Sequence, residues 1–214
     1  MNEPLLSPIE LAAYLCSRVC HDVISPVGAI TNGLEVLEEE NDAEMRGFAM
    51  DLIKKSAAQA SAKLQFARLA FGAAGSAGMQ IDLADAEAVT RAFLAGSKVQ
   101  LSWSGPRAVM AKNNVKLMLN LVLTGQQAIP RGGMLAVTIA ENPSSPAFTL
   151  RCSGEGARVP ADAEAFFSGS FDARPIDAHS IQPYYAALVA REAAMSVSFS
   201  RDGEAVVIAA SAHA

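Results

Sequence analysis

Apolar residues recur every three or four positions through the first forty residues of the chain. They are Leu11, Leu15, Val19, Val23, Val27, Ile30, Leu34 and Leu37. This spacing places them on one face of an α-helix and predicts a helix over residues 8–40. A similar pattern predicts a second helix over residues 43–71. Asn41 followed three residues later by Glu44 fits a capping box, so we expect a tight turn between the two helices.

The apolar face of the first helix is wider than one packing partner needs. Cys16, Cys20 and Ile24 extend it on one side. Because a lone antiparallel helix pair of this length cannot cover such a surface, we expect a homodimer that forms a four-helix bundle. The two cysteines stand one turn apart, before His21, and we expect them to pack in the core. A metal or haem site is the alternative, but the haem motif has two residues between its cysteines and this chain has three.

The second half of the chain alternates between strand and helix patterns. Strands are predicted at 99–104, 134–140, 147–152, 196–200 and 205–210, and helices at 83–94, 112–129 and 181–194. This order favours an α/β sandwich, with one mixed sheet covered by helices on a single face. The pair Asp202–Gly203 predicts a hairpin turn over 201–204, and Gly132–Gly133 is read as a turn into a strand.

A run of small residues at 71–78 reads as a linker between the two halves. The chain is therefore expected to be α+β, with a helical hairpin domain at 1–74 and a sandwich domain at 79–214.

Composition excludes several classes of protein. The net charge of −5 and pI of about 5.2 argue against a nucleic-acid partner. No apolar run reaches the ~18 residues of a membrane span, and the acidic N-terminus does not resemble a signal peptide. Three cysteines are too few and odd in number for a disulfide framework. We expect a cytoplasmic protein without a membrane partner.

His21 is the candidate reactive group. Each helical residue turns by ~100°, so His21 points away from the apolar stripe. Its face carries small or polar side chains, namely Tyr14, Ser17, Arg18, Ser25, Gly28 and Asn32. A neutral imidazole nitrogen is a good nucleophile, and a partner protein could approach it closely there. His21 could accept a phosphoryl group and later give it to an aspartate.

Neighbouring residues could support this chemistry. Asp22 could orient the ring and accept its proton, although adjacent helix residues do not face each other and Asp22 must reach sideways. Arg18 could steady phosphoryl charge, and Ser25 could hydrogen-bond the ring or an attacking water. Asn32 shares the face and is a further supporting candidate. Pro26 removes the backbone hydrogen bond to Asp22 and should bend the helix.

The segment from Cys20 to Pro26 resembles the H-box of histidine kinases, in which histidine is followed by an acidic residue, apolar positions and proline. The continuation over 27–35 is similar to that of the alphaproteobacterial ChpT-type histidine phosphotransferases. The resemblance runs along the whole chain. It implies that the second domain is similar to the histidine kinase ATPase (Bergerat) domain.

Three nucleotide motifs depart from an active kinase. The N-box is matched by Asn120, but Thr124 replaces the asparagine that holds Mg²⁺. In Cys152-Ser153-Gly154-Glu155-Gly156, cysteine replaces the aspartate that recognises adenine. The glycine-rich phosphate loop is replaced by residues 179–185, which contain no glycine. The resemblance implies a kinase-like domain that does not bind ATP.

The resemblance further implies a phosphorelay. Phosphate would arrive from the receiver domain of a hybrid histidine kinase and leave to response-regulator receivers, in circuits that govern cell-cycle progression. No cofactor or metal is expected on this chain, since Mg²⁺ would sit in the partner receiver. The kinase-like domain would help to dock the receiver.

Three other functions stay open: an active kinase fragment, a receiver-binding module without chemistry, and a receiver phosphatase that acts through water. Glu38–Glu40 is read as a solvated helix end, with a docking surface as the alternative. His179 and His213 are read as ordinary surface residues.

Overall fold

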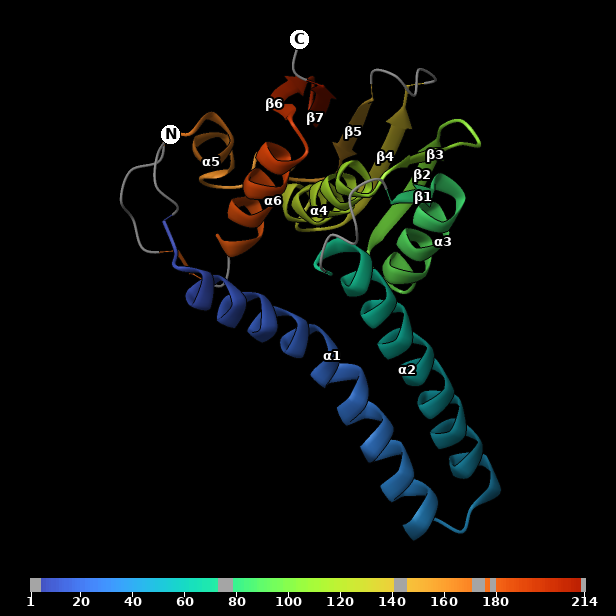
Figure 1. Ribbon diagram of the computed structural model, residues 1–214. Helices are drawn as coiled ribbons and strands as arrows, with labels where there is room; N and C mark the ends of the chain where they lie inside the picture. Colours follow the sequence, from blue (N-terminus) through green and yellow to red (C-terminus); the bar gives the residue numbers. More distant parts are fainter. Residues whose placement is uncertain (1–4, 73–78, 141–145, 171–175, 178–179, 213–214) are drawn as a thin grey trace.

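The computed structural model describes residues 5–72, 79–140, 146–170, 176–177 and 180–212. Two long helices open the chain, α1 (Pro8–Glu39) and α2 (Ala43–Ala70). They run antiparallel as a hairpin that projects from the second domain (Figure 1). The hairpin predicted from the apolar periodicity is confirmed to within one residue at each end.

The cap of the second helix differs from the prediction. Asp42, not Asn41, is the N-cap of α2, and its side chain accepts a hydrogen bond from the N–H of Met45 at 3.0 Å. The expected capping box between Asn41 and Glu44 is therefore wrong. The Glu40 carboxylate instead accepts from the N–H groups of both residues of the turn, at 2.9 and 3.1 Å. This contact holds the turn so that Asp42 stands where the helix begins.

The second domain contains seven strands and four helices within the described residues. They are β1 (Gln80–Asp82), α3 (Leu83–Leu94), β2 (Val99–Ser104), β3 (Val109–Ala111), α4 (Lys112–Ala128), β4 (Gly133–Ile139), β5 (Ala147–Ser153), α5 (Ala163–Ser168), α6 (Ile181–Glu192), β6 (Met195–Asp202) and β7 (Ala205–Ala212). Every strand and helix that the sequence predicts here is present. The sequence missed β1, β3 and α5, because elements of three to six residues are too short to show a period.

Five strands form one mixed sheet in the order β2-β4-β5-β7-β6. The β2–β4 pair is parallel, with Leu101 opposite Leu135, and the remaining pairs are antiparallel. The predicted turn between β6 and β7 is confirmed, with Asp202 paired to Ala205 and Gly203 at a positive φ of 59°.

The core lies between this sheet and the helices α3, α4 and α6, which cover one face (Figure 1). Along β5, Phe148, Leu150 and Cys152 are buried while the residues between them are more exposed. That alternation is the pattern of a sheet with one covered face. The predicted α+β fold is confirmed.

The first half of α1 packs against the second domain. Leu11 and Leu15 contact the cluster that contains Ile181 and Tyr184 of α6. The hydroxyl of Tyr14 donates to the carbonyl of Ile176 at 3.0 Å. These contacts bring the turn of α1 that carries His21 close to the helices of the second domain.

Cys16 and Cys20 are exposed in the single chain, so the prediction that they pack in the core is wrong at this level. The reason is that α2 covers only one side of α1, where Pro26 and Gly33 are buried.

Most of the proposed linker, together with His179 and His213, lies outside the described residues. Among those described, no helix is long and apolar enough to cross a membrane.

Candidate functional site

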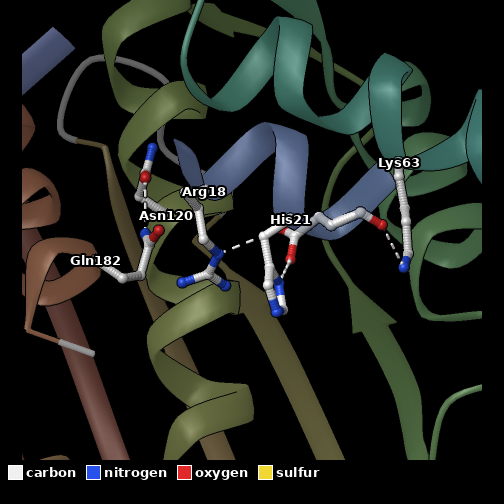
Figure 2. Close-up of polar contacts among 6 residues, drawn as sticks. Arg18, His21, Lys63, Asn120 and Gln182 are labelled. Carbon is white, nitrogen blue, oxygen red and sulfur yellow. Dashed lines mark hydrogen bonds and ion pairs between the residues drawn. The ribbon is translucent and has the colours of Figure 1, made fainter. Parts of the chain in front are cut away.

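His21 stands on the outside of α1, with 85% of its side chain exposed. Its Nδ1 atom faces Asp22, whose Oδ1 lies 3.6 Å away (Figure 2). This distance permits electrostatic attraction but is longer than a hydrogen bond. Asp22 thus reaches sideways along the helix, as the sequence requires of an adjacent residue.

Arg18 holds the other oxygen of the same carboxylate. Its Nε donates to Asp22 Oδ2 at 3.2 Å, one helical turn before the aspartate. Both side chains are largely covered, with 23% and 29% exposed. Charge-assisted hydrogen bonds are directional, so Arg18 fixes the carboxylate with one oxygen turned toward the ring.

This arrangement suits nucleophilic attack by the second ring nitrogen. A carboxylate opposite Nδ1 favours the tautomer that carries its proton there. Nε2 of His21 then keeps its lone pair and, since the ring is exposed, points to solvent. Asp22 can stabilise the ring when a bond to Nε2 makes it cationic.

A cavity of about 360 Å³ adjoins the histidine. Its lining comes from both domains: Tyr14, Ser17, Arg18, His21 and Asp22 of α1, Gln127 of α4 and Ile181 of α6. Of the predicted site residues, it brings together Arg18, His21 and Asp22. Sequence reasoning missed Gln127, which lies far away in the chain and carries no local motif for this role.

Ser25 and Asn32 lie outside the lining of this cavity. Ser25 is exposed one turn after His21, still on the same helix. Asn32 is also exposed and lies ~16 Å from His21 along α1, at ~1.5 Å per residue. Their supporting roles stay predictions.

The proline of the motif changes the hydrogen bonding of the α1 backbone, while the predicted bend of the helix stays a prediction. Pro26 is buried inside α1 and has no N–H, so it cannot bond the carbonyl of Asp22. That carbonyl instead accepts from Nζ of Lys63 on α2 at 2.7 Å (Figure 2). Lys63 was missed from the sequence, because its partner is 41 residues away.

Asn120, which the sequence pattern matches to the kinase N-box, is fully buried. Its amide nitrogen donates to the carbonyls of Ala70 and Lys116, both at 2.8 Å. Its oxygen accepts from Nε2 of Gln182 at 2.9 Å. The side chain therefore joins α4 to the end of α2 and to α6, as Figure 2 shows for the pair Asn120 and Gln182.

Thr124 and Cys152, at the other nucleotide-motif positions, are also fully buried. Burial raises the pKa of the Cys152 thiol to about 12, so the thiol stays neutral in the fold. A Cβ added at Gly125 would lie 3.0 Å from the sulfur of Cys152. The interior at this point is closed by close packing.

The glycines of the same region meet backbone to backbone. A Cβ on Gly154 would lie 2.2 Å from the carbonyl oxygen of Gly132, and one on Gly133 would lie 2.2 Å from that of Ser153. Gly132 and Gly133 also adopt positive φ values of 91° and 139°. Their prediction as a turn into a strand is confirmed, because β4 begins at Gly133. Only glycine allows this close approach.

The described residues contain no cluster of three or more His, Cys, Asp or Glu side chains that could hold a metal ion.

Known proteins are similar to this chain in sequence and in fold. The family model described as histidine phosphotransferase C-terminal domain matches residues 83–205. The protein phosphotransferase ChpT of Brucella abortus (strain 2308) is 51% identical over 96% of this chain and 97% of its own. A solved structure of a bacterial phosphotransferase is 48% identical, with a TM-score of 0.84 over 96% of this chain and 97% of its own.

More distant similarity extends to a histidine kinase. The structure of AdeS from Acinetobacter baumannii is 12% identical, with a TM-score of 0.44, and covers 90% of this chain and 96% of its own. The family model and the 51% identical relative together span the chain almost from end to end. The chain therefore belongs to the histidine phosphotransferase family.

Proposed function

We propose that this phosphotransferase relays a phosphoryl group through His21 between two receiver domains. The observation that carries the proposal is the exposed His21 ring with Asp22 opposite its Nδ1 atom. The Nε2 lone pair attacks the phosphorus of a receiver's aspartyl phosphate, and the bond from phosphorus to the aspartate oxygen breaks. The aspartate leaves as a carboxylate, and Asp22 stabilises or accepts the Nδ1 proton of the phosphorylated ring.

The second half of the relay is the same reaction in reverse. A carboxylate of another receiver attacks phosphorus and the P–N bond breaks, so His21 returns to its neutral form. The chain supplies position and nucleophile, which are the main contributions to phosphoryl transfer. The Mg²⁺ that neutralises phosphoryl charge would belong to the receiver.

We also propose that the relay proceeds without ATP on this chain. At the positions that match the nucleotide motifs, the side-chain amide of Asn120 is hydrogen-bonded to other parts of the protein, and Cys152 is a buried neutral thiol. An adenine base would need a carboxylate where this chain has the neutral Cys152 thiol.

The receiver would dock against both domains. Gln127 and Ile181 of the second domain line the same cavity as His21, so a receiver that presents its aspartyl phosphate to the ring reaches them too. The proposed donor is the receiver of a hybrid histidine kinase, and the proposed acceptors are response regulators.

A homodimer would cover the exposed apolar surface of the hairpin. Most exposed large apolar side chains of the described residues lie on α1 and α2, including Ile24, Leu34 and Phe48. Apolar area of this extent favours burial against a second copy. The same contact would cover Cys16 and Cys20.

The test is a reconstituted relay. A radiolabelled phosphoreceiver from a hybrid kinase is mixed with a response-regulator receiver and this protein, without ATP, as wild type and as His21→Ala. We expect label to pass to the second receiver only with the wild type, through an acid-labile protein intermediate.

Other outcomes identify the alternatives. Binding of the receiver by both forms without transfer would favour a sequestering module. Release of free phosphate without a labelled intermediate would favour a phosphatase. Labelling from ATP alone would favour a kinase. Each of these results contradicts the relay.

A further inference from the structure

Pro26 leaves one carbonyl of α1 without its helical partner. The carbonyl of Asp22 would normally accept from the N–H four residues later, which proline lacks. An unpaired carbonyl in the middle of a packed helix is unfavourable. The partner that replaces the lost N–H comes from the other helix of the hairpin.

Lys63 is that partner. Its ammonium donates to the Asp22 carbonyl at 2.7 Å, across the interface between α2 and α1. The side chain is half-buried on α2. Charge-assisted hydrogen bonds of this length are among the stronger ones in proteins. Pro26 and Lys63 therefore act on the same carbonyl oxygen. Pro26 removes its helical hydrogen bond, and Lys63 supplies another one.

Asp22 links this contact to the reactive ring. Its backbone is held from α2 by Lys63, while its carboxylate lies between Arg18 and Nδ1 of His21, at 3.2 and 3.6 Å. A change in the backbone at residue 22 would move both the carboxylate and the adjacent imidazole.

We propose that Lys63, paired with Pro26, is a positioning residue for phosphotransfer: it fixes the backbone of Asp22 and thereby the geometry of Asp22 and His21. The proposal rests on the proposed function, since it concerns the same histidine. It adds a role for the second helix of the hairpin in setting the chemistry on the first.

The test is a double-mutant cycle with Lys63→Met and Pro26→Ala. Alanine at position 26 restores an N–H that can bond the Asp22 carbonyl, so Lys63 becomes dispensable. We expect Lys63→Met alone to lower the transfer rate at saturating receiver by about tenfold, while half-saturation stays within about twofold. In the Pro26→Ala background, the same substitution should cost less than about twofold.

Two controls accompany the cycle. Lys54→Met removes a lysine charge from an exposed position of the same helix and should transfer like the wild type. Lys63→Arg keeps a cationic donor and should recover part of the rate. Thermal unfolding shows that each variant is folded before rates are compared.

A second readout does not depend on phosphotransfer. The ¹⁵N chemical shifts of the His21 ring, assigned with His21→Ala, report how much of the neutral ring carries its proton on Nδ1. Lys63→Met should lower that share, and Pro26→Ala should suppress the effect.

The two readouts separate the failure of each idea. If wild type does not transfer but the ring responds as described, the relay fails and the positioning role stands. If Lys63→Met leaves both ring and rate at wild-type values, the positioning role is overturned. Equal losses with and without Pro26 would also overturn it, because Lys63 would then act by another route.

Discussion

Asp22 is the charged side chain that faces the imidazole of His21. It stands 3.6 Å from Nδ1 and is held by Arg18 from the other side. A short carboxylate has few rotamers, so this double contact limits its position. The ring itself is exposed, so we expect its reactivity to depend on this neighbour and on the proposed partner receiver.

We predict that Asp22→Asn slows transfer from a phosphoreceiver by about ten- to a hundredfold, the range that a positioned acid–base group contributes. Asparagine keeps the size of the side chain but cannot take the Nδ1 proton. Single-turnover labelling kinetics measure the effect. Asp51→Asn, at an exposed position of α2, is the matched control. Equal rates for Asp22→Asn and wild type would remove Asp22 from the chemistry.

Cys152 gives a second prediction at this scale, for stability at alkaline pH. Burial raises its pKa from 9.0 to about 12 in the fold. Between these values the unfolded chain binds fewer protons than the folded one, so stability falls as pH rises. At pH ~10.5 the loss relative to pH ~8 should be about 2 kcal/mol from this thiol.

Urea unfolding of wild type and Cys152→Ala at both pH values measures that loss. The alanine variant starts from lower stability because it leaves a cavity, but it should lose less on going to alkaline pH. If both proteins lose the same free energy between the two pH values, the buried thiol is not the cause.

The sequence predicts local chemistry better than contacts between distant residues. His21, Asp22, Arg18 and Pro26 lie within nine residues, and helical geometry alone relates them. Lys63 approaches the same turn only because the hairpin folds back at its particular register. A long lysine on a helix has no pattern that distinguishes this role from a solvated one.

At the scale of elements, α4 and α6 complete the lining of the cavity beside the histidine. α4 is buried over most of its length, and Asn120 joins it to α2 and α6. The sequence predicted both helices and the changed nucleotide motifs. It did not predict that the end of α4 reaches the cavity beside α1, because that requires the packing angle between the two domains.

We predict that Gln127→Ala lowers kcat/KM for receiver phosphotransfer by about three- to tenfold, an effect of the size of one lost polar contact. Gln126→Ala is the matched control, since that half-buried neighbour on α4 is not among the residues that line the cavity. Transfer rates across a series of receiver concentrations give the value. Equal rates for the two variants would contradict docking of the receiver at this cavity.

At the scale of the whole molecule, the hairpin carries most of the exposed large apolar side chains of the described residues. α1 and α2 cover each other on one side only, and large apolar side chains remain exposed along both. The sequence indicated this surplus through the width of the apolar stripe. The prediction for the cysteines is wrong for the single chain, because periodicity identifies an apolar face without saying whether another element covers it.

We predict that the protein is a dimer and that Phe48→Asp shifts it toward monomers by at least about tenfold in dissociation constant. The reason is that a charge would replace an aromatic ring that the dimer would bury. Phe48 is 63% exposed in the single chain and lies on α2. Sedimentation equilibrium measures the shift. Asn41→Asp adds the same charge in the hairpin turn and should leave the dimer intact. A monomeric wild type at micromolar concentration would contradict the homodimer.

The most direct test of the account is to locate the phosphoryl group. The protein is incubated with a phosphorylated receiver without ATP, digested at alkaline pH to preserve phosphohistidine, and fragmented for mass spectrometry. We predict phosphate on His21 and on neither of the other two histidines of the chain. We also predict no phosphate after incubation with ATP alone. Phosphate on another residue, or labelling of His21 by ATP without a receiver, would contradict the relay through His21.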